Sequence, residues 1–197
     1  MADLQAGLQP LGITCALTTQ PLPKRPLRET KLITPETRSA VLAVDIQESF
    51  NPSQALISGV CKLQSRYYTV ATLELHEEEA VPFAAQLGWT PPTTDRCLVP
   101  ADKIFTKHGY LPPRQLVAHL RQRRVTQVFV CGVQTETCVL AAGFVLFDAG
   151  LKPTLVADLQ AGSSLDPSGA LGLRLWRHHF GAVAETHGAL LPEAPDV

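Results

Sequence analysis

Short apolar runs alternate with helical patterns along the chain from Ser39 onward, and this order is the strongest constraint on its fold. Most runs are apolar at every position, as expected for parallel strands that have helices packed on both faces of the sheet. Helices are expected over 115–124 and 138–148, and another after Asp166–Pro167, where a capping residue precedes proline. Between Phe50 and Tyr68 there is room for only a short crossover helix. The expected strands are 40–44, 69–73, 103–106, 127–131, 153–157 and 182–185.

Composition and charge exclude several classes of protein. The chain has 197 residues, of which 45% are hydrophobic and 18% charged, as expected for one globular domain with a substantial core. A net charge of -1 argues against nucleic acid as a partner, and no apolar run approaches the roughly 20 residues that span a bilayer. The five cysteines are scattered, without the close pairs of a structural zinc site, which indicates a reducing compartment. We therefore expect a cytoplasmic protein that binds neither nucleic acid nor membranes.

Residues 1–36 are expected to form an N-terminal arm, and residues 37–197 the folded domain. The arm holds several prolines, few acidic residues and the basic run 24–28. We interpret it as a surface arm across the domain or a partner subunit, in preference to a targeting segment.

Three residues carry the chemistry that the sequence suggests. Asp45 follows the first expected strand, Lys107 follows the third, and Cys138 opens the helix after the fourth. Ligands of open parallel sheets bind beyond the carboxyl ends of the strands, so these side chains are expected to meet there. Taken singly, each has an ordinary interpretation: a turn carboxylate, a solvated lysine and a small buried cysteine. Together they suggest a hydrolase in which Cys138 attacks, Asp45 shuttles the proton and Lys107 stabilises charge.

The helix start should also favour the thiolate form of Cys138, because unpaired backbone N–H groups and the helix dipole lower a thiol pKa. The backbone N–H groups of Gln134 and Cys138 are candidates for an oxyanion hole.

Three motif blocks resemble those of the isochorismatase-like cysteine hydrolases. These are Asp45 to Phe50 after an apolar strand, Lys107 after its strand, and 131–139, which reads CGVQTETCV. The resemblance extends from about 35 to 185. It implies an α/β fold, a single Rossmann-like three-layer domain with a mostly parallel six-stranded sheet. It further implies the catalytic set Asp45, Lys107 and Cys138, a cis peptide between Val133 and Gln134 that shapes the oxyanion hole, and a homo-oligomer.

The same resemblance suggests which bond is cleaved. The family includes nicotinamidases, carbamoyl and ureido amidohydrolases, and isochorismatases that cleave a vinyl ether. The siderophore-type isochorismatases lack the cysteine, so Cys138 favours hydrolysis of a C–N bond in a small amide or ureido compound, through a thioester and without a cofactor.

A metal site is the weaker interpretation of the segment after the second strand. Glu74-Leu75-His76 resembles the Asp-x-His motif of metal-binding nicotinamidases, but neither 77–82 nor 89–93 supplies a further histidine. We expect Glu74 and His76 to be polar groups at the pocket edge, which makes a nicotinamidase a less favoured alternative. The residues expected to line a substrate pocket are Phe50, Gln47, His108, Tyr110 and Trp89.

A second class of function also fits the sequence. A family member that has lost turnover could serve as a binding or scaffold protein, and the short crossover after Phe50 and the partial metal motif are compatible with that. The intact set of Asp45, Lys107 and Cys138 argues for an enzyme. The loops 74–102 and 109–113 are expected to determine specificity, but loop residues do not name the substrate.

Overall fold

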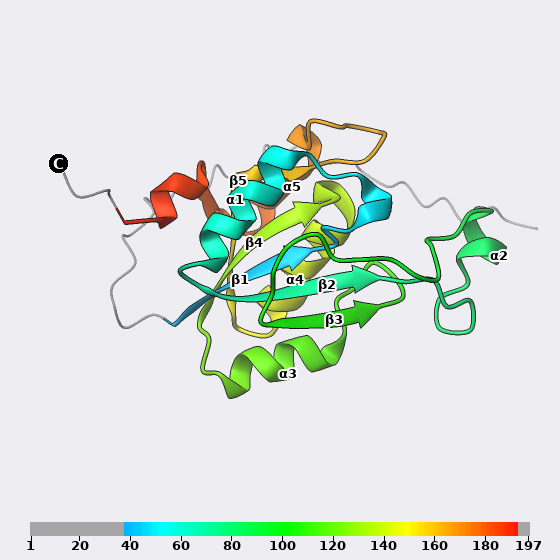
Figure 1. The fold of residues 1–197 in the computed structure, drawn as a ribbon, viewed down its shortest axis with the longest axis horizontal. Coiled ribbons are helices and arrows are strands. Elements are labelled where there is room, and N and C mark those ends of the chain that lie inside the picture. The colour runs from blue at the N-terminus through cyan, green and yellow to red at the C-terminus, as the bar shows by residue number, and fades with distance from the viewer. Residues whose placement is uncertain (1–37, 193–197) are drawn as a thin grey trace, which may run out of the picture.

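A single six-stranded parallel sheet forms the centre of the protein in the computed structural model, which describes residues 38–192 (Figure 1). The strand order is β3-β2-β1-β4-β5-β6, so the chain starts in the middle of the sheet, builds one half and then crosses to the other. The α/β fold and the six strands expected from the sequence are confirmed. The strands are β1 Ser39–Val44, β2 Tyr68–Glu74, β3 Lys103–Lys107, β4 Gln127–Val133, β5 Lys152–Ala161 and β6 Val183–Ala184.

Helices cover both faces of the sheet. The helix α1 packs on one face, where Leu56, Val60 and Leu63 join the side chains of Val41 and Phe129 in one buried cluster. The other face carries the remaining longer helices, in a second buried cluster that includes Leu120, Leu146 and Trp176. The helices are α1 Gln54–Gln64, α2 Phe83–Leu87, α3 Arg114–Gln122, α4 Leu140–Asp148 and α5 Ala170–His179.

Several boundaries differ from the sequence expectation. The strands β2, β3 and β4 run further toward their carboxyl ends than expected, so Glu74 and Lys107 are strand residues. The crossover after Phe50 has room for an 11-residue helix, α1, whose first turn is capped by the side chain of Ser53. The short helix α2 was not expected; it lies beyond the carboxyl ends of β2 and β3 in Figure 1.

The helix expected directly after Asp166–Pro167 starts later, at Ala170. Gly169 adopts a left-handed conformation with φ 71°, which turns the chain before the helix. Gly169 is the N-cap residue, but Asp166 Oδ2 still accepts a hydrogen bond of 2.6 Å from the backbone N–H of Leu171 in the first turn.

The proposed N-terminal arm, residues 1–36, lies outside the described residues. Within residues 38–192, no helix combines the length and the apolar character that a membrane span requires.

Candidate active site

Three charged side chains meet at the carboxyl edge of the sheet because of strand order and register. The central strand β1 is paired with β2, and β2 with β3, in parallel. Asp45 directly follows β1, while Glu74 and Lys107 are the last residues of β2 and β3 and are direct partners in the register. Paired residues of parallel strands point to the same face, so Glu74 and Lys107 lie side by side.

Lys107 is the centre of the cluster. Its Nζ donates hydrogen bonds to Glu74 Oε2 at 2.5 Å, to the carbonyl oxygen of Gly109 at 2.7 Å and to Cys138 Sγ at 3.3 Å. It also lies 2.9 Å from Asp45 Oδ2. Burial by itself would lower the pKa of Lys107, but the neighbouring acidic groups, Asp45 first, then Cys138 and Glu74, outweigh it and raise that pKa, so the side chain is an ammonium.

Asp45 is held behind this ammonium. Its side chain is fully buried, and its backbone has a left-handed conformation with φ 49°. The hydroxyl of Thr72 donates to Asp45 Oδ1 at 2.7 Å and accepts from the Asp45 backbone N–H at 3.2 Å. Burial raises the pKa of Asp45, and Lys107 opposes that rise.

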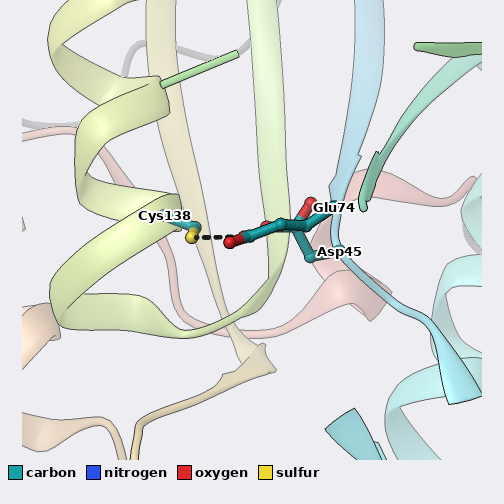
Figure 2. Close-up of side chains that lie close together, drawn as sticks. All are labelled: Asp45, Glu74 and Cys138. Carbon is teal, nitrogen blue, oxygen red and sulfur yellow. Dashed lines mark hydrogen bonds between the residues drawn. The ribbon is translucent and has the colours of Figure 1, made fainter. Parts of the chain in front are cut away.

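Cys138 lies in the π-helical turn Thr135–Val139, which joins β4 to α4. Its side chain is 6% exposed, and the thiol donates a hydrogen bond to Glu74 Oε2 at 3.4 Å (Figure 2). Burial raises the pKa of this thiol, as do Asp45 and Glu74, and Lys107 only partly opposes them. The direction of this shift is opposite to the lowered thiol pKa that the helix start predicts.

The peptide bond between Val133 and Gln134 is cis, as the resemblance implied. It lies at the end of β4, immediately before the turn that carries Cys138. Gln134 and Cys138 both line the same cavity, so their assignment to an oxyanion hole stays a prediction with both residues in suitable places.

A cavity of about 370 Å³ opens in front of the thiol, at the lower end of the size range for small-molecule sites. Trp89 and Tyr110, each about half exposed, form part of its wall and pack against the buried ring of Phe83, at centroid distances of 5.2 and 5.8 Å. The cavity is therefore part aromatic and part polar. Its lining residues are Phe50, Glu74, Trp89, Tyr110, Gln134, Thr137, Cys138, Ser163 and Ser164.

Two of the five expected pocket residues do not line this cavity. Gln47 is fully buried and joins the ends of two strands: its side chain accepts from the Glu74 N–H at 2.8 Å and donates to the Glu74 carbonyl at 3.0 Å and to Asp95 at 2.7 Å. His108 directly follows Lys107, and neighbouring extended residues point to opposite sides. Its ring contacts the carbonyl oxygen of Leu75 and the carboxylate of Glu77.

Sequence reasoning also missed three lining residues, Thr137, Ser163 and Ser164. The two serines follow β5, which extends to Ala161 and was expected to end at Ala157. Their position after a strand of a parallel sheet was the signal that could have identified them.

Glu74 lines the cavity, as expected of a polar group at the pocket, and it also lies in the middle of the charged cluster, 2% exposed. Its Oε2, Asp45 and Cys138 offer atoms within 4.8 Å of one another, a spacing that could suit a metal ion. The Lys107 ammonium, however, contacts all three, so a cation is already present between them. His76 does not join this group; it pairs with Glu78 at 3.2 Å.

Comparison with known proteins identifies the family and the fold. The family model of the isochorismatase domain matches residues 39–188. The chain belongs to the isochorismatase family. Its α/β fold is shared by solved structures that are similar to it at low sequence identity, and among curated protein sequences none matches.

Three of these structures illustrate the kinds of protein that share the fold and the degree of similarity. Pyrazinamidase/nicotinamidase from Streptococcus mutans UA159 has a TM-score of 0.62 at 20% identity, over 74% of this chain and 99% of that one. A cysteine hydrolase from Pseudomonas syringae pv. phaseolicola has a TM-score of 0.63 at 18% identity, over 78% and 90%. N-carbamoylsarcosine amidase from Thermoplasma acidophilum has a TM-score of 0.65 at 16% identity, over 80% and 100%. The chain is thus an isochorismatase-family hydrolase with amidohydrolases among its structural neighbours.

Proposed function

We propose that this protein is a cysteine hydrolase that cleaves the C–N bond of a small amide or ureido compound through a thioester intermediate. One observation carries the proposal: the Cys138 sulfur lines a cavity and lies 3.3 Å from an ammonium and 3.4 Å from a carboxylate. This set supplies a nucleophile, an acceptor for its proton and a positive charge that stabilises the resulting thiolate.

The reaction starts from the neutral thiol. A carboxylate of the cluster accepts the thiol proton as the sulfur attacks the carbonyl carbon, and the Lys107 ammonium stabilises the charge on sulfur. The backbone N–H groups of Gln134 and Cys138 are the proposed donors to the oxyanion of the tetrahedral intermediate. Loss of the protonated nitrogen leaves a thioester on Cys138, which water then hydrolyses.

Ammonia release from a panel of small amides and ureido compounds tests the proposal. Cys138→Ala should abolish release, and mass spectrometry of the wild-type protein during turnover should show the acyl group on the peptide that contains Cys138. Cys61→Ala is a matched control, because Cys61 is half-buried in α1 and does not line the cavity. Release that survives in Cys138→Ala would refute the mechanism, and binding of an amide without turnover would favour a scaffold role.

A nicotinamidase is the second candidate, because Phe50, Trp89 and Tyr110 give the cavity an aromatic wall that suits a flat ring. Among the similar structures, several are described as nicotinamidases. Nicotinamide therefore belongs in the panel. Activity should survive dialysis against a chelator, because Lys107 lies between the acidic side chains and the thiol; stoichiometric zinc or iron whose removal stops turnover would contradict this.

A further inference from the structure

We infer that the substrate of this site is a primary amide with an apolar acyl chain, long enough to leave the cavity and lie against exposed apolar side chains at its mouth. The inference rests on the hydrolysis proposed above and names the class of compound that the site takes. Three features support it: a closed end beside the thiol, a cavity wall without basic side chains, and an apolar rim that continues this wall outward.

The first feature is the closed end of the site. The side chains of Asp45, Glu74 and Lys107 are at most 3% exposed, and the hollow between Thr72, Lys107 and Cys138 is too small to hold a water molecule. The leaving nitrogen has to approach a carboxylate of this cluster to receive its proton, so it must point toward this end. The closed end leaves room for hydrogen atoms on the nitrogen and not for a substituent. Ammonia is therefore the leaving group that fits.

The second feature is the wall that the acyl part must face. Since the nitrogen takes the closed end, the acyl part extends into the cavity of about 370 Å³. Aromatic rings and hydroxyl groups line this part of the cavity, and among the described residues no basic side chain does. A negatively charged acyl part would lose its hydration there without gaining a partner. The acyl part that fits is therefore neutral and largely apolar.

The third feature is a rim of exposed apolar side chains. Three segments line the cavity through Trp89, Tyr110 and Ser164, and each has a leucine at least half exposed within two residues of its lining residue. Within residues 38–192, only three other large apolar side chains are exposed to a similar degree. Exposed apolar surface that is concentrated beside a cavity is typical of a ligand-binding groove. The rim leucines are Leu87, Leu111 and Leu165.

The part of the rim that carries Leu165 is held in position although it is exposed. The Asp166 N–H donates to the Ser163 carbonyl oxygen at 3.1 Å, and the Leu165 N–H donates to the Ser163 hydroxyl at 3.1 Å. Glu136, from the turn that carries Cys138, accepts a hydrogen bond of 2.9 Å from the Ser163 N–H and so ties this loop to the site. An apolar surface that is already ordered binds a chain at a lower entropic cost than one that must first be ordered.

The reaction of such a substrate balances with the residues present. Cys138 forms the C–S bond to the acyl carbon, the C–N bond breaks, and ammonia leaves with the proton that a carboxylate of the cluster took from the thiol. Water then forms the C–O bond as C–S breaks, and the same carboxylate returns a proton to the sulfur. The sum is primary amide plus water to carboxylic acid plus ammonia, with the protein unchanged.

Unbranched amides of different length test the inference, with ammonia release as the measurement for primary amides. A methylene group that is about half covered by the rim should raise kcat/KM about twofold, so octanamide should exceed butyramide about 15-fold. The gain should appear in KM, with kcat nearly constant, because the chain contacts the rim equally in the ground state and the transition state. N-Hexylacetamide, an isomer of octanamide with its chain on the nitrogen, should be cleaved at least about 100-fold more slowly, measured as hexylamine release.

A double variant tests the rim itself. Leu111→Ser combined with Leu165→Ser should reduce the octanamide-to-butyramide ratio of kcat/KM to less than about fourfold, because most of the covered length of the chain loses its apolar contact. Both side chains are exposed, so the fold should tolerate the change. Phe147→Ser is the matched control: Phe147 is a similarly exposed apolar residue on α4 that does not line the cavity, and its replacement should leave the ratio unchanged.

Several outcomes would overturn the inference: equal kcat/KM for octanamide and butyramide, an unchanged ratio in the double variant, or N-hexylacetamide cleaved as fast as octanamide. A kcat/KM for nicotinamide above that for octanamide would also overturn it, in favour of the second candidate function. If the double variant changes the oligomeric state in light scattering and not the ratio, the rim is an interface between copies of this chain. Absence of Cys138-dependent ammonia release from every amide would instead refute the hydrolysis itself, so the two failures are distinguishable.

Discussion

Replacing Thr72 by valine tests how firmly the structure holds Asp45. The Thr72 side chain is 1% exposed, and its hydroxyl bonds both to the Asp45 carboxylate and to the Asp45 backbone N–H. Valine has nearly the same shape and suits a strand, so the change removes the two hydrogen bonds and opens no cavity. It leaves a buried carboxylate oxygen and a buried N–H without their partner.

The expected loss of stability follows from these two groups. A buried polar group left unsatisfied costs about 1–3 kcal/mol, so two of them cost about 2–6 kcal/mol. Burying a methyl group in place of the hydroxyl returns about 0.8 kcal/mol. We therefore expect Thr72→Val to lower the free energy of unfolding by about 1–5 kcal/mol, a substantial part of the stability of a typical domain. The pKa of Asp45 should rise further, because the Thr72 hydrogen bond lowers it.

Urea unfolding followed by circular dichroism measures this loss by linear extrapolation. Thr154→Val is the matched control: Thr154 is also buried in a strand, but its hydroxyl accepts a single hydrogen bond, from Gln127, whose half-buried amide can turn to water. The control should lose less than about 1.5 kcal/mol. If Thr72→Val is within about 1 kcal/mol of the wild type, or if the two variants lose the same, Thr72 does not hold Asp45 as described.

Three further predictions concern backbone, thiol and substrate. Gly132 has φ 120°, and an added Cβ would collide with the carbonyl oxygen of Val44, so Gly132→Ala should accumulate little soluble protein. The control Gly150→Ala, at a residue with φ 75° and open space around it, should lower the free energy of unfolding by only about 1–2 kcal/mol in a urea titration. Burial raises the pKa of Cys131 to about 12 from 9.0, so the stability that the protonated thiol contributes is complete below about pH 9 and is lost as the pH rises toward 12. Between pH 9 and 11, the free energy of unfolding of the wild type should therefore fall more steeply than that of Cys131→Ala, by about 1.4 kcal/mol per pH unit. Equal slopes for the two proteins would disprove this. Among the described residues, the cavity lining carries the acidic Glu74 and no basic side chain, so kcat/KM should be at least about tenfold higher for butyramide than for succinamate; a preference for succinamate would contradict the charge argument.

The strands of the sheet were predicted well from the sequence, because the apolar pattern that indicates a strand is contained within the strand itself. Each of the six expected runs contains a strand. The inner strands β1, β2 and β4 are buried on both faces, which requires apolar residues nearly throughout, whereas the edge strand β3 is largely exposed. The errors lie at the carboxyl ends, where β2 and β3 end in Glu74 and Lys107. Polar residues there resemble loop residues, although both side chains belong to the candidate site.

The candidate site was only partly predictable, because it depends on contacts between distant segments. Asp45, Lys107 and Cys138 were found from their positions after strands. Glu74 was assigned to the pocket edge, since nothing in the 28 residues between β2 and β3 (75–102) indicates that it pairs with Lys107. The direction of the Cys138 pKa shift was also beyond the sequence, because it depends on burial and on a second carboxylate. The homo-oligomer and the cytoplasmic location stay predictions.

The register of β2 and β3 fixes the position of Glu74 beside Lys107 independently of the segment that connects the two strands. Glu74 and Lys107 are aligned by the same backbone hydrogen bonds that hold the two strands together. A shift of one residue in the pairing of β3 with β2 would turn Lys107 to the opposite face, so the ion pair depends on the register of the sheet. The intervening segment 75–102, which carries Trp89 and α2, contributes to the cavity wall without setting that alignment. Changes in this segment can therefore reshape part of the cavity wall without disturbing the alignment of Glu74 with Lys107.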